Sequence, residues 1–139
     1  MNSQGGVRRS ERLSSRQRLH DPDEFQAVYA ARDSVRSRSV VLCFVRNGLK
    51  HSRLGVSVSR KYGNAVRRNR IKRVFRAAFR QCQHELPAGY DYVLIPRHGV
   101  EEYYTAVVVE ELRRAVPKIA SGGSVRKSGD RVTSAEQPG

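Results

Sequence analysis

The sequence is short of acidic residues and contains no long hydrophobic run. Only 13 of its 139 residues are Asp or Glu, against 27 Lys and Arg, which gives a formal net charge of +14. No stretch approaches the roughly 18 to 20 apolar residues that a membrane span needs, and residues 1–20 hold no apolar run. The sequence therefore predicts a cytoplasmic protein without a secretory signal. Its charge favours a polyanionic partner, either nucleic acid or an anionic membrane surface.

Residues suited to metal binding or catalysis are few and scattered. Cys43 and Cys82 lie far apart within apolar patterns, so two buried free thiols are expected rather than a disulfide or a metal pair. The four histidines lack metal-ligand spacing. The acids fall mainly in two outer segments, whereas metal-dependent cleavage of a phosphodiester by a protein needs clustered carboxylates. We therefore expect no metal site and no catalytic residue in this chain.

The hydrophobic pattern predicts one domain, residues 18–118, between two disordered tails. Residues 1–17, which are basic, and residues 119–139 are rich in polar and small residues and show no periodicity. Within the domain, "DPDEFQAVYAAR" predicts a helix with Asp21 as its N-cap. The apolar run at 40–45 predicts a buried strand, and "RLGVSVSRK" predicts an alternating one. "NGLKHS" between them is interpreted as the loop of a hairpin.

The second half of the domain predicts a helix, a strand and a last helix. Ile71, Val74, Phe75, Ala78, Phe79 and Cys82 form a helical stripe. "YDYVLIPR" predicts another strand, and "VEEYYTAVVVEELRRAVPKI" predicts a helix with Tyr104 on its apolar side. Three helices and a small sheet indicate an α+β two-layer sandwich.

The segment from Arg60 to Arg80 carries nine Lys or Arg residues and no acid. On a helix, Asn69, Lys72, Arg73, Arg76 and Arg80 fall opposite the apolar stripe. Arg67 and Arg68 instead project toward the apolar side, so either the first turns overhang the sheet edge or these residues bind something there.

Three interpretations of this basic face compete. A solvated charged face normally mixes both signs, and this one does not. A membrane-surface helix would place its bulky apolar residues in lipid, but this stripe is needed to cover a sheet. A phosphate-binding surface fits best, because guanidinium groups match phosphate geometry. RNA is favoured over DNA, because the sequence shows no signature of a motif that reads the DNA major groove.

The same stretch resembles a known signature. "LGVSVSRKYGNAVRRNRIKRVFRAAFR" matches the G-x-S-V-S strand, the K-x-G-x-A-V turn and the R-N-R-x-K-R helix start of the bacterial ribonuclease P protein subunit. "EFQAVYAAR" and "LPAGYDYVLIPR" extend the resemblance to roughly residues 18–117. The resemblance implies a mixed sheet with a left-handed β-α-β crossover through the basic helix.

The resemblance also implies a role. In this family a large catalytic RNA uses Mg²⁺ to remove the 5′ leader from precursor tRNA, and the small protein binds that RNA subunit and the leader. The residues implied to bind the RNA subunit are Arg60, Lys61, Arg67, Arg68, Asn69, Arg70, Lys72, Arg73 and Arg76. Those implied to bind the leader are Phe25, Tyr29, Ser57 and Ser59. Mg²⁺ is expected to be held mainly by the RNA and the substrate.

Two departures from the family pattern affect the leader site. Many relatives carry an aromatic residue where this sequence has Cys43, and Phe44 is expected to face the other side of the sheet. Relatives are also more basic where this sequence has "DPDE". Phe25 and Tyr29 share a helix face with Val28, so core packing competes with base stacking as their role. We expect Tyr29 at the wet edge and Phe25 deeper in the core.

Two other functions suit part of the sequence. A ribosomal or other structural RNA-binding protein would have the same basic composition. A nuclease with its own catalytic residues is disfavoured by the scattered acids.

Overall fold

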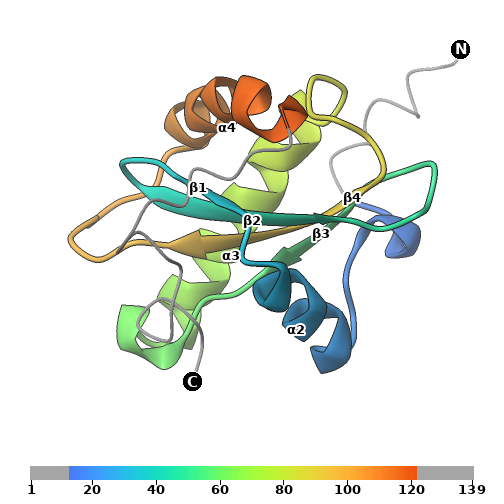
Figure 1. Cartoon of the computed structure of the whole chain (residues 1–139). Coiled ribbons are helices and arrows are strands. Elements are labelled where there is room, and N and C mark those ends of the chain that lie inside the picture. The colour runs from blue at the N-terminus through green and yellow to red at the C-terminus, as the bar shows by residue number, and fades with distance from the viewer. Residues whose placement is uncertain (1–12, 122–139) are drawn as a thin grey trace, which may run out of the picture.

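The computed structural model describes residues 13–121, which form a four-stranded sheet with helices on both faces (Figure 1). The order of the strands is β1-β2-β4-β3. β2 pairs with β1 and with β4 in antiparallel fashion, whereas β3 and β4 are parallel. The elements are η1 (Ser15–Gln17), α2 (Pro22–Ala31), β1 (Ser34–Arg36), β2 (Val40–Arg46), β3 (Arg53–Val56), η2 (Arg60–Tyr62), α3 (Ala65–Cys82), β4 (Tyr90–Pro96) and α4 (Thr105–Ala120). The predicted α+β fold with three helices and a mixed sheet is confirmed.

Alternation along the strands separates two apolar layers. On one face, sheet residues such as Phe44 and Tyr92 pack against α3 and α4. On the other face, Cys43 and Val93 pack against α2. Cys43 and Phe44 therefore face opposite sides of the sheet, as predicted. Helix α2 covers the face opposite α3 and α4. Both cysteines are buried and free, as predicted.

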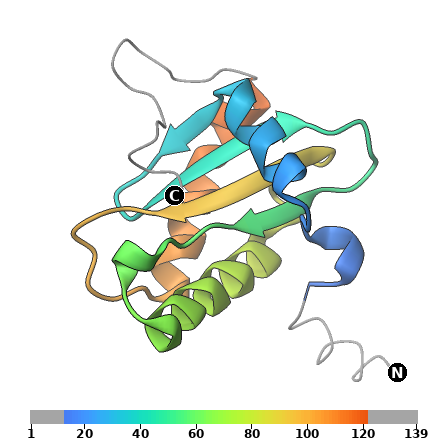
Figure 2. The same ribbon diagram turned by 90° about the horizontal axis from the view of Figure 1, so that it is seen from below.

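The basic helix connects the two parallel strands. Figure 2 looks onto the face that α2 covers, where β3 and β4 point the same way and α3 lies on the far face. With both strands pointing left in that view, β4 lies above β3. This arrangement makes the β3–α3–β4 crossover left-handed, against the usual right-handed sense, as the resemblance implied.

The predicted hairpin between the second and third strands is wrong. β2 and β3 are not neighbours, because β4 lies between them and pairs with both. The hairpin of the sheet is instead β1–β2, and the sequence interpretation missed β1 because that strand is only three residues long. The loop after β2 therefore spans the width of β4.

The ends of the domain lie slightly outside the predicted limits. Leu13 is buried in the core and η1 follows it, so residues 13–17 belong to the folded part rather than to a tail. α4 continues to Ala120. The rest of the two predicted tails, residues 1–12 and 122–139, lies outside the described residues.

The outer helices follow the prediction with one exchange of residues. Asp21 caps α2 in a capping box with Glu24. α4 begins at Thr105 instead of Val100, and Tyr104, predicted on its apolar side, is the exposed N-cap. The buried tyrosine is Tyr103, whose hydroxyl donates to Ser39 O at 2.8 Å.

Candidate RNA-binding surface

The turn that leads into α3 is built for a sharp change of direction. Gly63 has a φ of 129°, and a Cβ at this position would lie 2.5 Å from the Arg67 side chain. Only glycine fits this backbone without strain. Asn64 then caps the helix, because its side chain accepts a hydrogen bond from the backbone amide of Arg67 at 2.9 Å. The turn fixes where the basic face of α3 begins.

The apolar stripe of α3 holds the helix against the sheet. Ile71, Phe75 and Phe79 are each at most 3% exposed. The opposite face carries the predicted RNA-binding residues of the helix, with Asn69, Arg70 and Arg73 exposed and Lys72 and Arg76 partly buried. Arg60 and Lys61 lie exposed on η2, at the start of the same surface. The structure therefore brings most of the predicted set onto one side of the molecule.

A groove runs between the N-terminal segment and this face of α3. We call it the α3 groove; its volume is about 670 Å³. It is lined by Leu13, Arg18, Asn69, Arg73, Arg76, Ala77, Arg80 and Gln81. Four of these eight residues are arginines and none is an acid, so the groove concentrates positive charge. A low-dielectric cleft lined by one sign of charge raises the local concentration of the opposite ion.

Arg18 was not among the predicted site residues, although it helps to form the groove. It pairs with Leu54 in an isolated β-bridge, and its guanidinium donates to Leu13 O at 3.3 Å from both Nε and Nη2. Gln17 also bonds to Gln83 at 2.9 Å, which ties the segment to the end of α3. Burial, followed by the nearby charge of Arg18, lowers the pKa of Arg76. An anion in the groove would relieve this repulsion.

Arg80 is the second groove residue missing from the predicted set. The sequence places it on the basic face, but it is not among the residues implied to bind the RNA subunit. Arg18 lies far from α3 in sequence, and only tertiary packing brings it there. The basic bias of the N-terminal segment was its one signal in the sequence.

Arg67 and Arg68 turn toward the protein. Arg67 donates from Nε to Tyr62 O at 2.7 Å, from Nη1 to Glu101 O at 2.8 Å and from Nη2 to Val100 O at 3.2 Å. Arg68 donates from Nε to Gly63 O at 3.1 Å. The guanidinium of Arg67 therefore holds the loop between β4 and α4 against the start of α3, which the sequence pattern did not predict.

The predicted leader-binding residues lie on the α2 face of the sheet, away from the α3 groove. Phe25 is half-buried, and its ring is so close to Gly55 that a Cβ there would lie 2.6 Å away. Tyr29 is only 9% exposed, and burial raises its pKa to about 12. Our expectation about these two rings is thus reversed, because Tyr29 is the deeper one. The ring of Tyr29 packs in the core, while Phe25 reaches the surface.

Two hydroxyls on this side, those of Tyr29 and Ser59, are buried in the fold. The Tyr29 hydroxyl lies beside the hydroxyl of Ser57, a contact that offsets part of the rise in its pKa, whereas Ser59 Oγ has no hydrogen-bond partner among the described residues. Ser57, the other predicted serine, is buried, and its backbone amide bonds to Leu94 O at 3.0 Å. A buried hydroxyl without a partner is costly, so Ser59 is suited to bind a polar ligand group.

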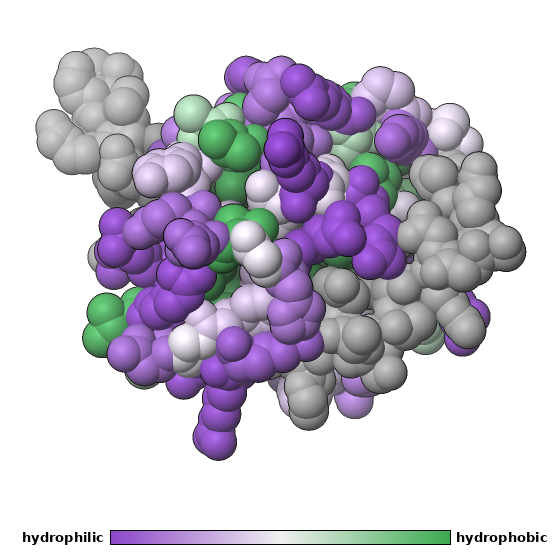
Figure 3. All heavy atoms as spheres, turned by 90° about the vertical axis from the view of Figure 1, so that its left-hand side faces the viewer, coloured by the Kyte–Doolittle hydropathy of each residue, from purple (hydrophilic) through white to green (hydrophobic). Residues whose placement is uncertain are grey.

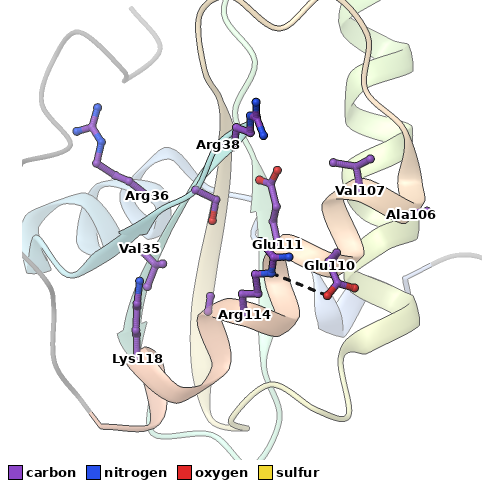
Figure 4. A pocket seen from close by; sticks show the side chains of 11 residues that line it. Val35, Arg36, Arg38, Ala106, Val107, Glu110, Glu111, Arg114 and Lys118 are labelled. Carbon is purple, nitrogen blue, oxygen red and sulfur yellow. Dashed lines mark ion pairs between the residues drawn. The ribbon is translucent and has the colours of Figure 1, made fainter.

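A second large hollow, of about 550 Å³, lies between β1 and α4 (Figure 4). Arg36, Arg38 and Lys118 are on its rim, but two glutamates line it as well. Glu110 lies 3.9 Å from Arg114, and the buried Glu111 accepts hydrogen bonds from the amide and hydroxyl of Ser39. The mixed charge makes this hollow a poorer phosphate site than the α3 groove.

Residues 13–121 contain neither a membrane-spanning helix nor a potential metal cluster. No helix in this range is long and apolar enough to cross a bilayer. No group of three or more His, Cys, Asp or Glu in this range is placed to hold a metal ion.

Comparison with known proteins places the chain in a family. The model of the family Ribonuclease P matches residues 13–120. The chain belongs to the ribonuclease P protein family. The ribonuclease P protein component of Thermotoga petrophila is 38% identical over 98 residues, which cover 70% of this chain and 84% of that protein. The one from Brevibacillus brevis is 36% identical over 111 residues, covering 79% and 85%.

Solved structures of ribonuclease P proteins share this fold. The protein from Thermotoga maritima superposes with a TM-score of 0.66 at 34% identity, covering 73% of this chain and 96% of that one. The protein from Staphylococcus aureus has a TM-score of 0.63 at 35% identity, covering 75% and 94%. Ribonuclease P is an endoribonuclease whose RNA subunit is catalytic, so this chain is the protein component that accompanies that RNA.

Proposed function

We propose that this chain binds the RNA subunit of ribonuclease P through the basic side of the molecule. The α3 groove carries the proposal, because it gathers Arg18, Arg73, Arg76 and Arg80 without a carboxylate. Guanidinium groups donate bidentate hydrogen bonds to phosphate, and several guanidinium groups along one groove can bind successive phosphates of an RNA backbone. Arg60 and Lys61 extend the contact beyond the helix start.

The α2 face binds the 5′ leader of precursor tRNA in this proposal. Phe25 offers a half-exposed ring on which an unpaired base stacks, and such stacking tolerates any sequence. The Ser59 hydroxyl offers the hydrogen bond that it lacks within the described residues, and the Tyr29 hydroxyl lies beside that of Ser57. Ser57 lies next to them, and its backbone amide donates a hydrogen bond to Leu94 O in the sheet.

The Mg²⁺ that the reaction needs is held by the RNA and the substrate. The protein lowers the concentration required, because its cationic groove supplies part of the counterion screening that Mg²⁺ otherwise gives. The complex acts in the cytoplasm, where precursor tRNA is made, and the products are a mature tRNA 5′ end and a released leader.

Reconstitution with the RNA subunit tests the proposal. The protein alone should cleave nothing, and its enhancement of cleavage should be greatest at low Mg²⁺. Arg73→Ala and Arg76→Ala should each weaken binding of the RNA subunit and reduce its log–log salt slope by about one unit per lost phosphate contact. Arg114→Ala, on the other side of the fold, is the matched control. Unchanged slopes in folded variants would show that these side chains are merely solvated.

The leader site has a separate test. Phe25→Ala should weaken binding of precursor tRNA with a long leader and leave a substrate with almost no leader unaffected. Equal losses on both substrates, with a lowered melting temperature, would show that Phe25 only packs the core. If binding is equally tight for any structured RNA and cleavage is not enhanced, the chain is a general RNA-binding protein instead.

A further inference from the structure

A small hollow lies at the first turns of α3, at the far end of the basic side from Arg80. Its volume is about 210 Å³. Helix α3 contributes Val66, Arg70, Ile71 and Val74, and the loop before α4 contributes Glu102 and Tyr103. Two hydrogen bonds from Arg67, to Glu101 O and Val100 O, hold that loop beside the helix. These hydrogen bonds fix the position of the loop and therefore the shape of the hollow.

Its outer wall is an apolar side chain in a polar neighbourhood. Val66 is 76% exposed, the largest exposed fraction among the large hydrophobic side chains at the described surface. Figure 3 looks onto the end of the molecule where α3 begins, and hydrophilic side chains predominate there with a few hydrophobic ones between them. Val66 does not contribute to the core, because the stripe of α3 begins at Ile71. Its exposure therefore has no explanation in the packing of the fold.

The polar residues of the hollow are of opposite charge. Arg70 is exposed on the same helix face, one turn after Val66, and Glu102 is exposed on the loop. A carboxylate is out of place on a surface that binds only phosphates, because it repels them. It is suited to accept a hydrogen bond from the exocyclic amine of a base, as Glu and Asp do with N4 of cytosine.

We propose that this hollow takes one unpaired nucleobase of the bound RNA, with cytosine preferred. The base lies with its face on Val66 and Val74, its N4 amine donates to Glu102, and Arg70 pairs with the adjoining phosphate. Sequence-specific recognition of RNA generally targets such unstacked bases. The proposal rests on the proposed function, to which it adds a base-reading contact beside the phosphate contacts of the α3 groove.

Nucleotide binding to the free protein tests the hollow directly. With valine methyls labelled for NMR, cytidine monophosphate should shift the Val66 and Val74 signals, and uridine monophosphate should bind about fivefold more weakly at this site. Glu102→Gln should abolish the preference, since an amide serves either base. Glu101→Gln is the control, because its side chain does not line the hollow. Equal shifts with inorganic phosphate, or none with any nucleotide, would overturn the proposal.

The complete complex supplies an independent test. Val66→Ser changes an exposed residue, so the protein should stay folded while its affinity for the RNA subunit falls about fivefold with an unchanged salt slope. Wild-type affinity in this variant and in Glu102→Gln would refute base reading but leave phosphate binding intact. Failure of the unmodified protein to bind the RNA subunit at all would instead refute the proposed function.

Discussion

Replacing Arg67 by alanine should destabilise the fold more than it weakens RNA contacts. The guanidinium makes three hydrogen bonds to backbone carbonyls, two of them at 2.7 and 2.8 Å, and so joins the start of α3 to the loop before α4. A buried bond from a charged donor contributes about 1.5 to 3 kcal/mol. Because this side chain is half-buried and water replaces part of each bond, about 0.7 kcal/mol per bond is the better value, or about 2 kcal/mol in all.

Thermal unfolding followed by circular dichroism measures this loss. For a domain of this size, about 2 kcal/mol lowers Tm by about 8 °C. Arg73→Ala is the matched control, since that side chain is exposed and its loss should change Tm by at most about 2 °C. Binding of the RNA subunit, measured well below both melting temperatures, should fall more for Arg73→Ala. An Arg67→Ala protein that melts like the wild type but no longer binds RNA would refute this assignment.

Three further outcomes follow from individual contacts. Gly55→Ala should destabilise the protein by about 1 to 3 kcal/mol in chemical denaturation, because the new Cβ would displace the ring of Phe25. Hydrogen bonds from the backbone amides of His20 and Asp21 lower the pKa of Glu24. The stability that ionised Glu24 contributes is therefore present above its unfolded-state pKa and is lost as the pH falls through its folded-state pKa. Glu24→Gln should flatten the acid side of the profile of stability against pH. Burial raises the pKa of Cys82 to about 11, so a thiol reagent at pH 8 should modify it only after unfolding.

Local patterns predicted the helices and the long strands, but not the order of the strands. The apolar stripe of α3 and the N-cap at Asp21 depend on residues close together in the sequence, and both are confirmed. The position of β4 between β2 and β3 depends on pairing between residues 38 to 56 positions apart, which no local pattern encodes. The short β1 offers too few residues for an alternation to be recognised.

The candidate site was predictable to the same extent. The motif around Arg68–Arg73 is continuous on one helix, so the sequence places it on one surface. Arg18 joins that surface only through tertiary packing, and Arg67 leaves it because the loop before α4 accepts its hydrogen bonds. The expected burial of Phe25 and Tyr29 is the reverse of what the structure shows, because Gly55 leaves room for the ring of Phe25 near the surface.

The position of β4 also determines when the protein can fold during synthesis. The ribosome releases α3 before β4, yet β4 is the central partner of both β2 and β3. Until Tyr90–Pro96 has emerged, Phe79 lacks the Tyr92 ring that it contacts in the finished fold, with centroids 5.9 Å apart. A nascent chain that ends before this strand has all the positive charges of α3 but lacks the strand that joins β3 to β2. In the proposed function, the surface that binds the RNA subunit is therefore complete only after the strand that joins β2 and β3 has emerged.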